Sequence, residues 1–216
     1  NDGEYTLTAG IRANHWDLNG ETVFSPRANL AWEPKWEKDW LFRFSTGYYH
    51  QPAFYRELRD FEGNLNKDIK AQRSIHFVLG ADYNFTAWGR PFKFVGEAYY
   101  KQMDNIIPYE LDNVRIRYYA ENSATAYAVG ADFKINGEFV KGVDSWLNIG
   151  FLNIQEDIGN DSYTTYFNTD GEEIKPGFTA NTDTASFQVT RPGHIPRPTD
   201  QRFNLSLFFQ DYLPKN

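Results

Sequence analysis

The sequence contains no cysteine and no run of about 18 apolar residues, although it is 216 residues long. The lack of cysteine excludes a disulfide framework and thiolate metal sites. The lack of a long apolar run excludes a transmembrane helix. Basic residues are outnumbered, with 22 Lys and Arg against 29 Asp and Glu, and the net charge of -7 argues against nucleic-acid binding.

Motifs for metal binding and catalysis are missing as well. The four histidines are scattered, without the close spacing of metal ligands: His15, His50, His76 and His194. There is no nucleotide-binding glycine loop and no nucleophile elbow. Ser45, His76 and Asp82 are the residue types of a catalytic triad, but nothing in the sequence fixes their mutual geometry. We therefore expect no catalytic residue, no metal and no cofactor, and the protein is not expected to be an enzyme.

What the sequence does contain is strict alternation of apolar and polar residues. In segment 73–85 one face is apolar, with Ile75, Phe77, Leu79, Ala81, Tyr83 and Phe85, and the other carries His76, Val78, Gly80, Asp82 and Asn84. A soluble sheet would bury the apolar face in a core. Here the pattern recurs in about eight segments and the polar face keeps carrying charges, which favours a barrel with lipid outside and water inside.

The alternation predicts strands at these positions: Glu4–His15, Thr22–Trp32, Trp40–Tyr49, Arg73–Phe85, a strand from Phe92, Ala124–Ile135, Ser145–Ile154 and Arg202–Tyr212. Asn19-Gly20 is a strong hairpin signal between the first two. Pro26 is awkward inside a paired strand, so we expect it near an end or a bulge. In the seventh strand Leu152 and Ile154 break the alternation.

Every second connection between these strands is short, and the others are mostly long. Short turns are expected at Glu33–Asp39, Thr86–Pro91 and Asn136–Asp144, the last around Asn136-Gly137. Long loops are expected at His50–Gln72, Asp104–Ser123 and Gln155–Gln201, and the extended pattern of Asn113–Tyr119 predicts a two-stranded ribbon in the second. Bacterial barrels place short turns in the periplasm and long loops outside the cell.

The tryptophans are concentrated at one end of the predicted strands. Five of the tryptophans lie in or beside the short turns, namely Trp32, Trp36, Trp40, Trp88 and Trp146, and only Trp16 lies at the other end. An aromatic girdle at one water–lipid interface has this pattern. The alternative is a soluble antiparallel sheet with tryptophans packed under its rim.

The polar face carries the candidate lumen-facing residues, which are Arg12, Arg27, Arg43, Asp82, Glu97 and Asp132, together with Lys93, Lys101 and Lys134. Charges would cost several kcal/mol against lipid near the midplane, so we expect them to face inward. They would contact a plug and a polar solute, or form a solvated wall of paired charges.

Ligand-binding candidates combine an aromatic face with a nearby cation. They are Tyr49 at the end of a strand and Tyr55, Arg56, Arg115, Tyr118 and Arg197 in the long loops. Rings beside guanidiniums could capture an anionic or ring-bearing ligand. The alternative is loop packing and charge pairing with Glu57, Asp60 and Glu110.

Several segments have a family resemblance. Ser25–Trp32 (SPRANLAW) and Gly47–Pro52 (GYYHQP) resemble barrel segments of TonB-dependent outer-membrane receptors. Phe54–Asp60 (FYRELRD), with Val114–Tyr119 and Asn136–Val140, resembles the versions found in Bacteroidota, and Gln201–Pro214 resembles a strand some way before the receptor's C-terminus. The similarity covers nearly the whole chain in the family's order.

The resemblance implies an all-β fold, a transmembrane antiparallel β-barrel of about 22 strands. About eight consecutive strands would lie in residues 1–216. The plug domain, the TonB box and the C-terminal strands would lie outside this chain, which opens without a signal peptide. The implied partners are outer-membrane lipid, the receptor's own plug, the TonB complex and a small solute or oligomer, with no nucleic acid.

The implied function is active transport of a scarce solute, such as a siderophore, vitamin, glycan or peptide, across the bacterial outer membrane. One alternative is a structural or adhesion barrel of the outer membrane that does not transport. The other is a soluble carbohydrate-binding β-sheet protein.

Overall fold

The computed structural model describes residues 3–211, and within them the regular structure consists of strands alone. The strands are β1 (Gly3–Trp16), β2 (Glu21–Pro34), β3 (Asp39–Gln51), β4 (Gln72–Ala87), β5 (Arg90–Ile106), β6 (Tyr109–Asp112), β7 (Arg115–Tyr118), β8 (Ala124–Val140), β9 (Val143–Ile158), β10 (Tyr163–Asn168), β11 (Thr184–Thr190), β12 (His194–Pro196) and β13 (Phe203–Gln210). In this range no helix is long and apolar enough to cross a membrane.

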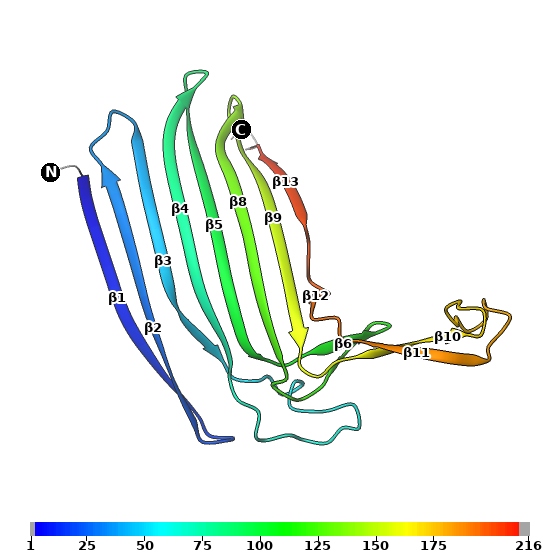
Figure 1. Ribbon diagram of the computed structural model, residues 1–216. Helices are drawn as coiled ribbons and strands as arrows, with labels where there is room; N and C mark the ends of the chain where they lie inside the picture. The colour runs from blue at the N-terminus through cyan, green and yellow to red at the C-terminus, as the bar shows by residue number, and fades with distance from the viewer. Residues whose placement is uncertain (1–2, 212–216) are drawn as a thin grey trace.

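Most of the strands form one curved antiparallel sheet in the order β1-β2-β3-β4-β5-β8-β9 (Figure 1). β12 pairs with one end of β9, and β13 pairs with the rest of it. These two strands therefore share the eighth position, which confirms the prediction of about eight consecutive strands. Among the described residues β1 and β13 pair on one side only, so the sheet is open.

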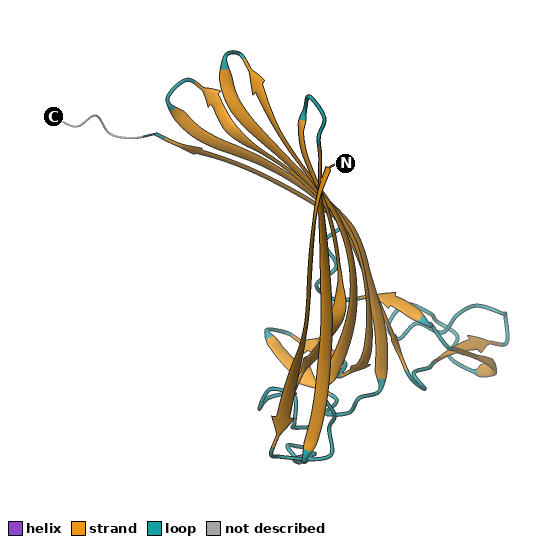
Figure 2. Cartoon of the chain, turned by 90° about the vertical axis from the view of Figure 1, so that its left-hand side faces the viewer, coloured by secondary structure: helices purple, strands orange, loops and turns teal. Residues whose placement is uncertain are grey.

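The two ends of the sheet differ, as the sequence predicts. Short turns join β2 to β3, β4 to β5 and β8 to β9 at one end, which we call the turn end. The long connections lie at the other end, the loop end, together with the short turn between β1 and β2, and Figure 2 shows how the long connections gather there. β5 and β8 each have 17 residues, whereas a strand crosses a membrane with about 9–11. The strands therefore extend well beyond the length that a bilayer requires.

One face of the sheet is apolar across every strand. A single cross-strand row consists of Leu7, Leu30, Phe44, Leu79, Ala98, Ala131, Phe151 and Phe203. Nothing in the described chain packs on this face, and Leu7 and Leu79 are 71% and 61% exposed. An apolar surface of this extent is unfavourable in water and suits lipid. The alternation in the sequence is thus confirmed strand by strand.

Aromatic rings form a chain along the turn end of the apolar face. Successive rings lie 4.4–6.0 Å apart in the order Tyr5, Trp32, Phe42, Trp40, Tyr83, Phe85, Phe92 and Phe139. Trp36 and Trp88 add edge-on contacts to Phe42 and Phe92. Trp146 does not fit the predicted girdle: it shares a face with Asn148 and Gly150, stacks on Phe208 at 5.5 Å and lies under Lys134.

The predicted turn at Asn136–Asp144 is wrong in its position. β8 continues to Val140 and β9 begins at Val143, so the reversal occurs at Lys141-Gly142, where Gly142 has φ of 82°. The ladder to β5 continues through Asn136 and Gly137, and the Phe92 ring occupies the space beside Gly137. An Asn-Gly pair permits a turn, but here cross-strand packing keeps it extended.

Two further details differ from expectation. Pro26 lies inside β2 opposite Ile11, without a bulge, at the point where the pairing of β2 with β3 stops. A proline can occupy that position because the ladder to β3 ends at Arg27. Leu152 and Ile154 do not interrupt β9; they place apolar side chains on its polar face.

Two ribbons project from the loop end. β6 pairs with β7, which confirms the ribbon predicted in Asp104–Ser123. β10 pairs with β11 in the last long connection, where the sequence predicted only a loop, and Figure 1 shows this ribbon extending away from the sheet.

Candidate functional site

The charged residues predicted to face a lumen lie on the polar face of the sheet. Arg43, Gly80, Glu97, Asp132 and Gly150 follow one another in a single cross-strand row, one residue along from the apolar row. Arg12 and Arg27 lie on the same face of β1 and β2. The side chains are therefore where the alternation puts them, and that this face lines a lumen stays a prediction.

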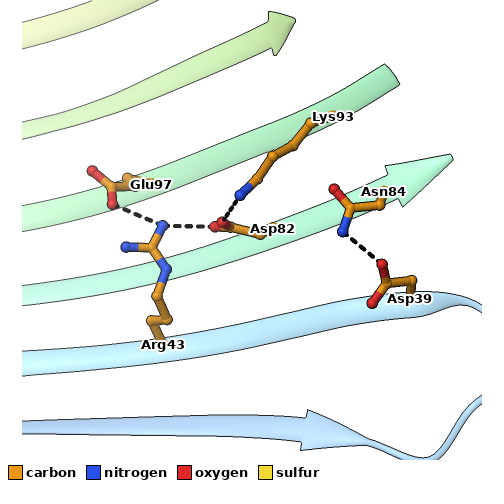
Figure 3. Close-up of polar contacts among 6 residues, drawn as sticks. All are labelled: Asp39, Arg43, Asp82, Asn84, Lys93 and Glu97. Carbon is orange, nitrogen blue, oxygen red and sulfur yellow. Dashed lines mark hydrogen bonds and ion pairs between the residues drawn. The ribbon is translucent and has the colours of Figure 1, made fainter. Parts of the chain in front are cut away.

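Toward the turn end the charges of the polar face form a connected network (Figure 3). Arg43 Nη2 lies 2.7 Å from Asp82 Oδ1 and 3.1 Å from Glu97 Oε1, and Lys93 Nζ lies 2.8 Å from Asp82 Oδ2. The Arg43 guanidinium lies in the space that a side chain at Gly80 would fill. The network joins β3, β4 and β5 and balances two positive charges with two negative ones.

Asp82 holds this network together, since it is 9% exposed and contacts both cations. Asp82→Asn is expected to destabilise the protein by about 1–3 kcal/mol, because Arg43 and Lys93 lose their shared carboxylate. Asp132→Asn is the matched control and should change stability by less than about 0.5 kcal/mol. Urea unfolding from liposomes measures both, and equal effects would mean that the network contributes nothing specific.

Toward the loop end the polar face changes character. The Arg27 guanidinium lies 4.3 Å from the centre of the Tyr49 ring, and that ring stacks on His76 at 4.2 Å. Lys101 Nζ lies 5.2 Å from the centre of the Tyr99 ring. We call these five residues the cation–aromatic wall. Its cations contact rings, whereas those of the network contact carboxylates.

The structure does not assemble the imagined triad. His76 and Asp82 are six residues apart on β4, which is about 20 Å in an extended strand. Asp82 is occupied by Arg43 and Lys93, and His76 by Tyr49. Within residues 3–211 no three His, Asp or Glu side chains lie grouped so that they could hold a metal ion.

Three of the six ligand candidates come together above the loop end. Tyr118 packs against the apolar cluster of the loops. Burial raises the pKa of the Tyr118 hydroxyl and nearby Glu57 adds to the increase, whereas Arg56 and Arg197 act in the opposite direction. Glu57, Arg56 and Arg197 therefore each lie within electrostatic range of Tyr118, and the Tyr109 ring, 5.8 Å from that of Tyr118 and 5.5 Å from the Arg197 guanidinium, lies between Tyr118 and Arg197. Arg56, Tyr118 and Arg197 form the loop cluster of candidates.

Arg197 also contacts a residue of the sheet. Its Nε lies 3.0 Å from Oε2 of Glu156, a buried residue near the end of β9, and its guanidinium lies 5.5 Å from the Tyr109 ring centre. The sequence placed Glu156 in a loop, because the apolar residues Leu152 and Ile154 hid the last part of β9. The Arg197–Glu156 ion pair joins the segment that follows β12 to the end of β9.

The other candidates do not join the loop cluster. Tyr55 is 68% exposed, and its hydroxyl accepts a hydrogen bond from Arg59. Arg115 is exposed in β7, where it pairs with Asp112 across the ribbon. Tyr49 belongs to the cation–aromatic wall. The sequence missed His76 and Tyr99 as members of this wall. The contacts of Tyr49 with Arg27 and His76 depend on the register of β2, β3 and β4, whereas Tyr99 contacts Lys101 on the same strand.

The long loops form an ordered platform at this end. Ala53, Leu58, Ile69, Ile107 and Ala120 make a buried apolar cluster between the first two long loops. The amide of Asn66 donates to the carbonyl of Ala120 at 2.9 Å, and Asn19 donates to the carbonyl of Ile69 at 2.7 Å. The platform therefore fixes the loops relative to the strand ends.

The sheet is open and antiparallel, its strands are long, and it has one apolar face, one charged face and a line of rings at the turn end. Together these features define the wall of a transmembrane β-barrel. Residues 1–214 match the family described as TonB dependent receptor-like, beta-barrel, and the chain belongs to that family. Comparison with curated proteins and with solved structures gives no match.

Membership of this family confirms the main prediction from sequence. The chain is part of an outer-membrane protein of Gram-negative bacteria, and the family's proteins are transporters rather than enzymes. The soluble carbohydrate-binding alternative is therefore set aside. The resemblance to Bacteroidota receptors is not addressed by the match and stays a prediction.

Proposed function

We propose that this chain forms part of the wall of a TonB-dependent transporter that imports a scarce solute such as a siderophore, vitamin, glycan or peptide. The observation that carries the proposal is the pairing of a lipid-type apolar face with a charged face on the same eight strand positions. On a sheet whose other face meets lipid, a charged face of this kind is stable where it lines an aqueous interior.

The open edges support a larger barrel. β1 and β13 leave rows of backbone donors and acceptors unpaired in the described chain, and unpaired backbone groups are costly in lipid. We infer that the remaining strands of a barrel of about 22, its plug domain and its TonB box belong to the same receptor outside residues 1–216. A barrel of that width needs a plug to remain closed to other solutes.

The loop platform supports capture of the solute from outside the cell. Arg56, Tyr118 and Arg197 combine a phenol with two guanidiniums at the loop end, above the cation–aromatic wall. Rings and guanidiniums together bind planar or acidic groups. In this proposal the loop cluster makes the first contact, and Tyr49 lies deeper along the path.

Uptake by living cells tests the function. A strain lacking the full-length receptor is expected to lose growth on one limiting nutrient, and deletion of TonB should cause the same loss. In the complemented strain Arg56→Gln/Tyr118→Leu is expected to weaken uptake, because each lost contact reduces the free energy of ligand binding by about 1–3 kcal/mol. The control Arg115→Gln/Tyr55→Leu removes the same residue types outside the loop cluster and should leave uptake unchanged.

Surface expression is measured in parallel, because loops tolerate substitution better than strands and assembly should not change. Growth that persists without TonB would exclude energised transport. Uptake that is normal in the loop-cluster variant would place the ligand on other parts of the receptor.

A further inference from the structure

The loop-end half of the polar face carries cations that have no acidic partner. Within the described chain, neither Arg27 nor Lys101 forms an ion pair, and the buried Arg27 Nε has no hydrogen-bond partner. Two carboxylates of this region are already engaged: Glu21 accepts the amide N–H of Ala71, and Glu156 lies against Arg197. Asp132, on β8, interacts electrostatically with Tyr99 but forms no ion pair with Arg27 or Lys101. Positive charge is therefore left over here, in contrast to the balanced network near the turns.

The register places these cations side by side. One cross-strand row of the polar face consists of Gly10, Arg27, Gly47, His76, Lys101 and Ala128. Glycines flank Arg27 in this row, and the Arg27 side chain lies across the open position at Gly47, whereas His76 and Lys101 are direct neighbours. Arg27 and Lys101 are three strands apart, which is about 14 Å between backbones.

The rings hold the cations in place without neutralising them. Tyr49 lies between Arg27 and His76, and Tyr99 lies beside Lys101. A cation on a ring face keeps its charge, and its side chain is ordered before a ligand arrives. Such an arrangement binds a transient anion at a low entropic cost.

We propose that the cation–aromatic wall binds the acidic groups of the imported solute. The solute class is a small molecule with two or more carboxylate, phosphate or sulfonate groups on or beside a ring, spaced to reach Arg27 and Lys101. This inference rests on the proposed function and names the chemistry of its cargo. The ring of the solute lies against the wall between the two cations, next to the Tyr49–His76 stack, and its acidic groups receive hydrogen bonds from Arg27 and Lys101.

The test uses the purified full-length receptor in detergent and the fluorescent dye 1,3,6,8-pyrenetetrasulfonate, which combines a ring system with acidic groups. Fluorescence anisotropy reports binding. The dye is expected to bind the wild-type receptor and to be displaced by benzene-1,3,5-tricarboxylate but not by the neutral sugar raffinose. Arg27→Gln/Lys101→Gln should weaken binding about a hundredfold, or tenfold for each cation removed.

Two control variants isolate the role of charge at this position. Lys35→Gln/Lys141→Gln removes the same net charge from exposed residues at the turn end and should leave the affinity unchanged. Arg27→Lys/Lys101→Arg keeps both charges and should retain most of it. Heat-modified migration on gels verifies that each variant contains a folded barrel.

Three results would overturn the inference. The wild-type receptor could fail to bind the dye at millimolar concentration, or the Gln variant could bind it as tightly as wild type. The Gln variant could also show raised ion conductance in planar bilayers with unchanged dye affinity, in which case the cations hold the plug. Dye binding is measured without TonB. A failure of energised uptake would therefore count against the proposed transport function and not against this binding site.

Discussion

Leu79→Arg is expected to destabilise the membrane-inserted barrel by about 2–4 kcal/mol, and Val78→Arg, one residue away, by less than about 1 kcal/mol. Leu79 lies at the centre of β4 on the apolar face, opposite Phe44 and Ala98. A guanidinium there would face hydrocarbon near the midplane. Val78 points to the polar face between Ser45 and Tyr99, where an arginine remains hydrated.

The comparison is sharp because both variants add the same side chain to the same strand. Full-length receptor is folded into liposomes and titrated with urea, and tryptophan fluorescence gives the free energy of unfolding. If both arginines were tolerated equally, or Val78→Arg were the worse of the two, the apolar face would not be the lipid face.

Surface labelling is expected to divide the connections of the sheet into two classes. An epitope inserted between Gly177 and Phe178 should be detected on intact cells, because it lies beyond the ribbon of β10 and β11, where Phe178 is 91% exposed. An epitope between Lys141 and Gly142 should be detected only after the outer membrane is opened. Long loops outside and short turns in the periplasm are the rule for bacterial barrels.

Both insertion points lie in turns, where the hydrogen bonds at risk are local: the N–H of Phe178 donates to the carbonyl of Lys175, and the N–H of Gly142 donates to the carboxylate of Glu138. Asn168, by contrast, is buried and bonds to the backbone of Glu172 and Asn181, so an insertion there would disturb the ribbon itself. Growth on the limiting nutrient serves as the control for assembly. Labelling at Lys141-Gly142 in intact cells, with none at Gly177-Phe178, would reverse the orientation of the whole sheet.

Much of the sheet could be predicted because alternation is local information. The parity of Phe77 and Leu79 against His76 and Asp82 is visible in the sequence, and the register confirms it. Predictions that relied only on the alternation of residues along one strand were wrong at positions where packing between strands decides the structure. Phe92 covers Gly137 and keeps Asn136-Gly137 in β8, and Trp146 is on the polar face although its place in the sequence suited the girdle.

The candidate site was less accessible to prediction, because it depends on which residues of different strands become neighbours. Arg43 with Glu97, or Arg27 with His76, cannot be paired without the register, since a shift of two residues preserves every face. Residue types in the loops suggested Tyr118 and Arg197 but equally Tyr55 and Arg115, which lie apart from them. Loop folding that depends on a buried cluster leaves no periodic signal.

The glycines of the polar face affect how far neighbouring side chains reach into the proposed passage. The side chains of Arg43, Tyr99 and Asp132 each occupy the space that a side chain would fill on the adjacent strand, at Gly80, Gly130 and Gly150 respectively. These side chains consequently lie flat against the wall and do not stand out from it. At these three positions the inner surface of the wall therefore lies close to the backbone, and long polar side chains take up less of the proposed passage than they would if they stood out from the sheet.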